Sequence, residues 1–401
     1  MPWPSESPVL VRERFVLSAL AGSESFARVC RQFHIARSTG YKWLRRYRQG
    51  GRGGLGERSR RPWRSPRRIH SRWLKALRQL RRCHPCWGPR KLRARLQVLH
   101  PRVRLPSART LARWLQRLGL VRLKRRRQRR GPWLKPVPRR AASRPNDVWT
   151  IDFKGWFCIR DGSRIHPLTV RDLKSRFILD IRLVRNQTYE AIRPALQRVF
   201  RRYGLPRAIR VDNGPPFGGP SPRGLSRLAV WWRRLGIKVD YGRPAHPEDN
   251  AAHEQMHGVY QAEVAAHPVD SRVLLQRRSD RWRTQYNQLR PHEALGLCPP
   301  AQKYRPSPRI LPCKPLAWTY PAAWLTRRIN RHGRLYWRGR LRFVGEAFSG
   351  EQVGLCPTPD GTWKIYLGQD LLGLIHPKDH SSSIRPVQLR HPGKVSALSR
   401  H

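Results

Sequence analysis

Acidic residues are scarce in this 401-residue chain. Asp and Glu together number 24 against 84 Lys and Arg, which gives a formal net charge of +60. A free chain of that charge repels itself unless an anion neutralises it. A coding bias toward arginine does not explain runs as dense as RLKRRRQRR at 122–130. Nucleic acid, which carries roughly one charge per 1.7 Å of duplex, is therefore the expected partner.

Long apolar runs are also missing from the sequence. None approaches the ~20 residues of a membrane-spanning helix. The opening MPWPSESPVL has no basic stretch leading into an apolar one, as a signal peptide would. The seven cysteines are scattered and odd in number, which is typical of free thiols in a reducing cytosol. We therefore expect a cytoplasmic protein that makes no contact with a membrane.

Paired metal-binding motifs are nearly lacking as well. Cys83 and Cys86, in CHPC with His84 between them, have the spacing of zinc ligands. A zinc site needs a second pair of ligands, and the candidates, His70 and His100, are distant in the sequence. Buried or incidental thiols are the better interpretation of this motif.

Residues 8–50 are predicted to form a helix-turn-helix DNA-binding domain. SFARVCRQFH has apolar residues at helical spacing, and IAR makes a tight connection to STGYKWLRRYRQGG. That second helix is expected to start at Ser38 as its N-cap and to end in glycines. It would present its basic side chains to DNA as a recognition helix. A small helical bundle without a DNA-binding role is the alternative. The residues expected to contact DNA are Ser38, Thr39, Lys42, Arg45 and Arg46.

The next part of the chain alternates basic linkers with helices. Residues 51–70 are rich in Gly, Pro and Arg, which indicates a basic linker that could lie as an arm in the minor groove. Residues 71–121 predict a second helix-turn-helix-like domain of three helices. The last of them would be capped by Ser107 and closed by Gly119. A further basic linker follows at 122–146.

The composition changes again near residue 147. Segments rich in β-branched and aromatic residues, followed by alternating strand and helix patterns, predict an α/β core over 147–305. A Pro-rich linker is expected at 306–318. Short β segments separated by turn signals predict a small β-barrel-like module at 319–378, and the tail at 379–401 is expected to be disordered. The predicted fold is multidomain, with all-α units, an α/β core and a β module in that order.

Because acids are few, the well-placed ones are informative. Asp152 lies in mid-strand between Ile151 and Phe153, so alternation puts its side chain on the opposite sheet face. Asp212 ends a buried-looking strand, where ligands bind on open α/β sheets. Glu254 follows on a helix. Converging carboxylates of this kind are hard oxygen ligands for Mg²⁺, and two ions could activate the attacking oxygen and stabilise the leaving oxygen of a phosphodiester. The alternative, an aspartate that caps a turn, suits Asp212 but not Asp152.

The sequence HEQMH at 253–257 also matches the H-E-x-x-H pattern of zinc peptidases. Such an enzyme needs a third metal ligand and an edge strand that binds peptide. Only Glu263 and Glu293 follow nearby, and neither has supporting sequence around it. The helical spacing instead puts Asn250, Glu254 and His257 on one face.

The segments NDVWTIDFKG, DGSRIHPLTVRDLKSRF, YGLPRAIRVDNGPPF, LSRLAVWWRRLGI, DNAAHEQMHGVY and YNQLRPHEALGLCPPAQKYRPS occur in this order. In order, spacing and flanking sequence they resemble the integrase core of bacterial insertion-sequence transposases. These are relatives of retroviral integrases, with a ribonuclease-H-like fold and a D-D-E catalytic triad. The helical units before the core and the β module after it fit as well, so the resemblance covers nearly the whole chain.

The resemblance implies a catalytic triad of Asp152, Asp212 and Glu254 that holds two Mg²⁺ or Mn²⁺ ions. It implies a DNA transposase in which water cleaves the element ends and the freed 3′-hydroxyl joins target DNA. The expected partners are double-stranded DNA, both element ends and target, and a homodimer or higher oligomer, with no small-molecule substrate. The host would be bacterial and the protein nucleoid-associated. Residues expected to support the triad or contact DNA are Asn213, Asn250, His253, His257 and Gln261.

Four positions depart from the family pattern. Ala245 and Ala251 replace glycines, Val211 replaces serine, and Gln261 replaces a basic residue expected near the cleaved phosphate. A Cβ at position 251 would cost roughly 1 kcal/mol if its φ were positive. A catalytically decayed transposase that acts only as a sequence-specific DNA-binding protein is therefore the main alternative. A structure-selective nuclease on the same fold is another.

Overall fold

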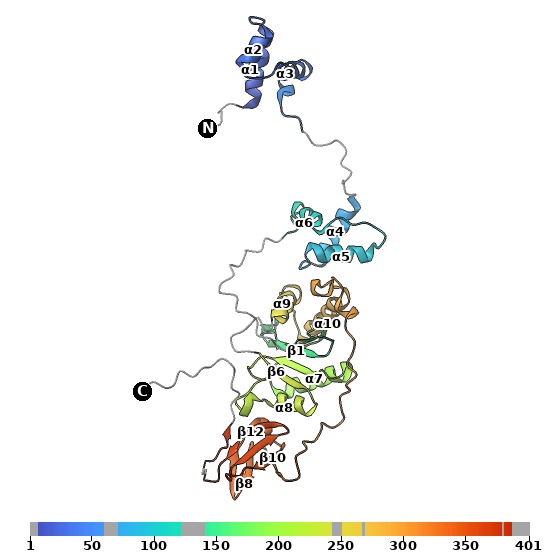
Figure 1. The fold of residues 1–401 in the computed structure, drawn as a ribbon. Coiled ribbons are helices and arrows are strands. Elements are labelled where there is room, and N and C mark those ends of the chain that lie inside the picture. Colours follow the sequence, from blue (N-terminus) through green and yellow to red (C-terminus); the bar gives the residue numbers. More distant parts are fainter. Residues whose placement is uncertain are drawn as a thin grey trace, which may run out of the picture. The chain divides into compact units, whose positions relative to one another are not determined.

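The computed structural model describes residues 7–59, 71–121, 141–242, 251–266, 269–378 and 381–386. The chain divides into two compact units, Met1–His70 and Ser71–His401 (Figure 1). Among the described residues, no helix is both long enough and apolar enough to cross a membrane.

The first unit is a small helical domain. It consists of α1 (Pro8–Ala21), α2 (Phe26–Gln32), α3 (Arg37–Gly50) and the 3₁₀ turn η1 (Gly51–Leu55). α3 packs so closely that a Cβ on Gly40 would lie 2.7 Å from Cys30 Sγ and 2.9 Å from the ring of Phe15. The N-cap prediction for Ser38 is wrong. Ala36 is the last residue with extended backbone, and Ser38 already lies within the first helical turn.

A second group of helices opens the other unit. It comprises α4 (Ser71–Cys83), α5 (Pro89–Leu99) and α6 (Ala108–Arg117). The side chain of Ser107 accepts a hydrogen bond of 3.2 Å from the backbone N–H of Thr110, which confirms the predicted cap. Gly119 follows the helix with a φ of +66°, a left-handed conformation that closes a helix well only with glycine.

The α/β core is built on one mixed sheet. Its strands are β1 (Val148–Phe153), β2 (Phe157–Cys158), β3 (Arg164–Asp172), β4 (Ile178–Val184), β5 (Ala208–Val211) and β6 (Lys238–Tyr241). β3 pairs antiparallel with β1, β2 and β4, whereas β5 pairs parallel with β1 and with β6. The order β2-β3-β1-β5-β6, with β4 also on β3, places β1 in the middle.

Helices cover both faces of this sheet (Figure 1). Trp149 and Ile151 of β1 share a core with α7 (Tyr189–Tyr203) and α8 (Arg227–Arg234). The opposite face packs against α9 (Ala251–Tyr260), its π-helical extension η4 (Gln261–Ala265) and α10 (Arg272–Leu289). The short 3₁₀ turns of the core are η2 (Pro222–Gly224), η5 (Glu293–Leu295) and η6 (Pro300–Gln302).

The C-terminal module is an antiparallel sheet and not the closed barrel that we expected. The sheet order is β13-β12-β11-β10-β7, and within the described residues β7 and β13 remain its two edges. β8 and β9 form a separate two-stranded sheet, whose Leu335 and Trp337 lie in the core of the module, and Phe343 of β9 makes a single bridge to Ser383 just before β13. The bounds are β7 (Leu325–Arg328), β8 (Arg334–Trp337), β9 (Arg340–Phe343), η7 (Glu346–Phe348), β10 (Gln352–Pro357), β11 (Trp363–Leu367), β12 (Asp370–Ile375) and β13 (Arg385–Pro386).

Two predicted boundaries differ from what the structure shows. β13 pairs with β12, so the sheet continues beyond residue 378, where we expected it to end. The Pro-rich segment is bonded to the core, since Leu205 N–H donates to Arg309 O at 2.7 Å and Ser307 N–H donates to Tyr203 O at 2.8 Å. α8 also packs into the β module through Ala229 and Val230. Residues 60–70 of the predicted linker at 51–70, residues 122–140 of the predicted linker at 122–146, and most of the predicted tail lie outside the described residues.

Candidate active site

The strand register relates Asp152 to Asp212. β1 and β5 run parallel, with Val148 opposite Ala208 and Thr150 opposite Arg210, an offset of 60 residues. The same offset puts Asp152 opposite Asp212, one residue beyond the end of β5. Opposite residues on neighbouring parallel strands lie about 4.8 Å apart and point to the same sheet face. Continued by two residues, the register therefore predicts that the two carboxylates lie side by side at the carboxyl ends of β1 and β5.

The face that carries Asp152 is the one covered by α9. Asp152 Oδ2 lies 3.9 Å from His257 Nδ1, whereas Ile151 packs against α7 and α8 on the other face. The predicted alternation along this strand is confirmed.

A threonine that the sequence analysis did not single out anchors α9 to the sheet. Thr169 on β3 lies opposite Asp152 and donates from Oγ1 to the Asp152 backbone carbonyl at 2.9 Å. The same oxygen lies 2.6 Å from His253 Nε2 and 2.8 Å from His257 Nε2. His253 Nδ1 in turn lies 2.9 Å from Thr150 Oγ1. One hydroxyl thus links both histidines of HEQMH to the strand of Asp152.

Burial keeps both histidines neutral. Burial, together with the positive charges of Lys154 and Arg171, lowers the pKa of His257 to about 3. It also brings the pKa of His253 well below its usual range, with His257 and Arg171 adding to the effect. Near neutral pH the two rings therefore act as hydrogen-bonding groups. Their Nε2 atoms face a shared hydroxyl, an arrangement that does not fit the zinc-peptidase interpretation.

Asp212 has a different environment. The residue is exposed, but the protein around its carboxylate desolvates it and so raises its pKa. A hydrogen bond from the backbone N–H of Gly214 lowers the pKa and partly offsets this effect. The neighbouring Asn213 donates from Nδ2 to the Gly242 carbonyl at 2.5 Å. Asn213 therefore holds the chain after β5 against the end of β6.

Glu254 and Gln261 are both exposed, seven residues apart along α9 and its π-helical extension. Ala251 is the first residue of α9. Asn250 and Ala245 lie outside the described residues.

The register of β1 and β5 thus favours the proximity of two of the three predicted triad residues, Asp152 and Asp212. Within the described part of the chain, no three His, Cys, Asp or Glu side chains gather closely enough to hold a metal ion. The cluster that the structure does form joins Asp152 to Thr150, Thr169, His253 and His257. The alternation of Thr150 with Asp152 on one strand face was the available signal for this cluster.

The predicted recognition helix is α3. Lys42 and Arg45 are exposed, as is Ser38, whereas Thr39 is partly buried. Arg46 and Lys42 both lie over the ring of the buried Trp43, each 4.9 Å from its centroid. Their charged ends are therefore held beside one aromatic ring.

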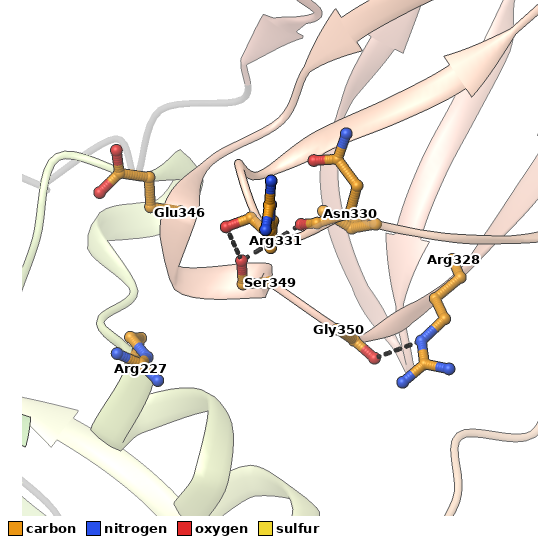
Figure 2. Close-up of a pocket in the computed structure, with 8 residues that line it drawn as sticks. Arg227, Arg328, Asn330, Arg331, Glu346, Ser349 and Gly350 are labelled. Atoms are coloured by element: carbon orange, nitrogen blue, oxygen red, sulfur yellow. Dashed lines mark hydrogen bonds between the residues drawn. The ribbon is translucent and has the colours of Figure 1, made fainter. Parts of the chain in front are cut away.

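A basic groove lies between α8 and the C-terminal sheet (Figure 2). It has a volume of 760 Å³. Arg328 donates from Nε to the Gly350 carbonyl at 3.3 Å, and Arg227 pairs with Glu190 at 3.0 Å. The lining residues are Arg227, Arg328, Ile329, Asn330, Arg331, Glu346, Ser349 and Gly350.

Comparison with known protein families agrees with this architecture. Residues 142–247 and 235–300 match integrase core domain families, and residues 11–62 match a helix-turn-helix domain. Residues 39–115 match a homeodomain-like domain. Residues 325–382 match the C-terminal domain of IS481 family transposases. In its domain content the chain is thus similar to the IS481 family of insertion-sequence transposases.

Two curated relatives come from bacterial insertion elements. An uncharacterized 39.2 kDa protein of element IS476 from Xanthomonas euvesicatoria is 31% identical over 230 residues, which cover 56% of this chain and 62% of that protein. An uncharacterized 31.7 kDa protein of IS407 from Burkholderia multivorans is 29% identical over 181 residues, which cover 45% of this chain and 63% of that protein. The chain thus spans less than two thirds of each relative.

Solved structures of viral integrases are more distant. The HTLV-2 integrase catalytic core domain in complex with magnesium is 17% identical, with a TM-score of 0.33, and covers 41% of this chain and all of that one. A simian T-cell lymphotropic virus intasome in complex with a PP2A regulatory subunit is 16% identical, with a TM-score of 0.36, and covers 75% of this chain and all of that one. At such scores, neither says anything about the reaction of this chain.

Proposed function

We propose that this chain is a DNA transposase that cuts at element ends and joins them to target DNA. The observation that carries the proposal is the alignment of Asp152 with Asp212 across two parallel strands of an integrase core. Paired carboxylates at the carboxyl end of a sheet suit a reaction at a phosphodiester, where charge develops on oxygen.

The same side chains suit a divalent metal. Asp152 and Asp212 offer hard carboxylate oxygens from adjacent strands, and a bound cation would offset the desolvation that raises the pKa of Asp212. In our proposal Glu254 completes the site for two Mg²⁺ or Mn²⁺ ions. Such ions supply an activated oxygen nucleophile and stabilise the leaving oxygen. Glu254 is exposed on α9, and in our proposal it joins the two aspartates at the metal site.

The remaining residues position the triad. His253 and His257 are buried, so we assign them to holding α9 on β3 through Thr169 and not to contacting DNA. Asn213 holds the loop that carries Asp212. Gln261 is exposed on the same helix as Glu254 and remains a candidate DNA contact.

DNA binding is assigned to the helical domains and the basic groove. We propose that α3 reads the element ends through Ser38, Thr39, Lys42, Arg45 and Arg46, and that the groove beside Arg328 and Arg331 holds a phosphate backbone. Bringing two element ends together requires a homodimer or higher oligomer on DNA.

A joining assay tests this function. Labelled duplexes taken from the DNA that flanks the gene are incubated with a supercoiled plasmid and the full chain, in Mg²⁺ or in EDTA. The proposal predicts joined product in Mg²⁺ alone. Tight binding of the end duplex without product in either buffer would favour the second candidate, a DNA-binding protein with a decayed core. The replacement of an expected basic residue by Gln261 is the observation that favours it.

A further inference from the structure

The chain just after Asp152 contains a β-bulge. β1 and β2 both pair with β3, with Phe153 opposite Leu168 and Phe157 opposite Ile165. Three residues, 154–156, lie between Phe153 and Phe157, whereas only two lie between their partners. One extra residue on one strand is the definition of a bulge.

The extra residue reverses which side chains face which layer. Phe153 packs against the core under α7 and α8, yet Phe157, four positions later, packs against the core under α9 and α10. Four positions on a regular strand would leave both on the same face. Gly155 supplies the turn with a φ of +89°, and open space surrounds the position of its missing Cβ. The bulge therefore redirects the side chain of Trp156.

Trp156 is exposed at this point. Its exposed fraction is 56%, whereas most of the large apolar side chains around it in the core are buried. The guanidinium of Arg164 lies over its ring, 4.6 Å from the centroid. A cation at that distance attracts the ring and holds its orientation. The exposure leaves much of the ring open to a further contact.

We propose that Trp156 is a stacking platform for an unstacked DNA base beside the reacting phosphodiester. This inference rests on the proposed function. Trp156 follows Asp152 by four residues, at the same end of β1, and Lys154 and Arg164 add positive charge around it. Aromatic rings with neighbouring cations suit bases and phosphates together. The ring is exposed beside a bulge that follows the strand of Asp152 directly, so a local role for it is expected.

The chemistry favours DNA over a protein surface as the occupant. The loop around Trp156 is basic, and the chain as a whole has a net charge of +60. A second copy of this chain would bring like charge toward the loop, whereas DNA brings the opposite charge. Trp156 acts on the base, so we class it as a residue that positions DNA.

The test uses 2-aminopurine, a fluorescent base that stacking quenches. It is placed in turn at each nucleotide flanking the joined phosphate of the end duplex. The full chain is bound with Ca²⁺ in place of Mg²⁺. The variants are Trp156→Ala, the conservative Trp156→Phe, and Tyr336→Ala as a matched control, since Tyr336 is 61% exposed on the C-terminal sheet. Joining is measured separately in Mg²⁺.

At one flanking position, the Trp156→Ala complex should fluoresce more strongly than the wild-type complex, with Trp156→Phe and Tyr336→Ala close to wild type. Joining by Trp156→Ala should fall about tenfold to a hundredfold. Equal fluorescence at every position, with equal joining, would overturn the inference while leaving the transposase proposal intact. A shift of the free Trp156→Ala protein to smaller oligomers, without any fluorescence change, would assign the ring to a subunit contact instead. Failure of the wild-type protein to join DNA would contradict the proposed function itself.

Discussion

Thr169 on β3 and His257 on α9 are joined by a hydrogen bond of 2.8 Å, although 88 positions separate them in the sequence. The same hydroxyl contacts His253 at 2.6 Å and the backbone carbonyl of Asp152 at 2.9 Å. The helix that carries Glu254 is thereby held to the strand that carries Asp152. The histidines of HEQMH orient the two elements with respect to each other.

Replacement of Thr169 by Val should loosen this contact. It leaves two buried histidine nitrogens without their hydroxyl partner, at a cost of about 1–3 kcal/mol in the free energy of unfolding. Joining should fall further than stability alone explains, because Glu254 loses its fixed support. Chemical unfolding and the joining assay measure the two effects. Thr284→Val, at an exposed hydroxyl on α10, is the matched control and should change neither. Unchanged joining by a folded Thr169→Val protein would remove the positioning role.

Stability should depend on pH through His292. Burial lowers the pKa of His292 to about 3, and the charges of Lys91 and Arg290 contribute. The unfolded chain, with an ordinary histidine pKa near 6.5, binds more protons than the folded chain between about pH 3 and pH 6.5. The free energy of unfolding should therefore fall as the pH drops through this window.

His292→Phe keeps an aromatic ring beside Tyr286, whose centroid lies 4.9 Å away, and removes the titrating group. When the pH falls from about 7 to about 5, the free energy of unfolding should decrease less for the His292→Phe protein than for the wild type. The difference between the two decreases should be on the order of 1 kcal/mol. Denaturant titrations at the two pH values measure this difference. Identical pH dependence in both proteins would show that His292 is not a source of acid sensitivity.

The basic groove should contribute to the salt dependence of DNA binding. Replacing both Arg328 and Arg331 with Ala would remove up to two phosphate contacts, and each contact contributes about 0.9 to the slope of log K against log salt. Binding of the end duplex is measured by fluorescence anisotropy over a series of salt concentrations. The matched pair Arg277→Ala and Arg281→Ala, exposed on α10, controls for the loss of charge. Equal slopes in the two double variants would exclude the groove as a phosphate site.

Features set by local chemistry could be predicted from the sequence. The cap at Ser107 needs only a serine followed three residues later by a free N–H. The face of Asp152 follows from the alternation along one strand. The position of Asp212 follows from the end of a short apolar strand.

Features that depend on distant parts of the chain could not be predicted. No local signal pairs Thr169 with two histidines more than 80 positions later. Whether the short strands of the C-terminal module form a closed barrel or an open sheet depends on how β8 and β9 pack. The turn residues in the sequence do not indicate this packing. The bulge at 154–156 is visible only when two strands are aligned on a third. The prediction that Ser38 is the N-cap of α3 was wrong because serine, although a good N-cap residue, is also tolerated within the first turn of a helix.

Ala251 departs from the family pattern, which has glycine at this position. Alanine favours helices, and position 251 begins α9. Ala251→Gly should therefore lower the free energy of unfolding, by up to about 1 kcal/mol, and should not restore any lost activity. Chemical unfolding checks the first expectation and the joining assay the second. A large gain in joining would mean that the turn before α9 needs the freedom of glycine.

The central claim is that Asp152, Asp212 and Glu254 act together on DNA, and paired variants test it most directly. Asp152→Asn and Glu254→Gln are compared with Glu190→Gln, an exposed glutamate that pairs with Arg227 near the basic groove. Each protein is measured for binding of the end duplex and for joining in Mg²⁺. We predict that the first two bind the duplex like the wild type and form no joined product, while Glu190→Gln does both. Normal joining by Glu254→Gln, or equal loss of binding and joining in the first two, would contradict the account.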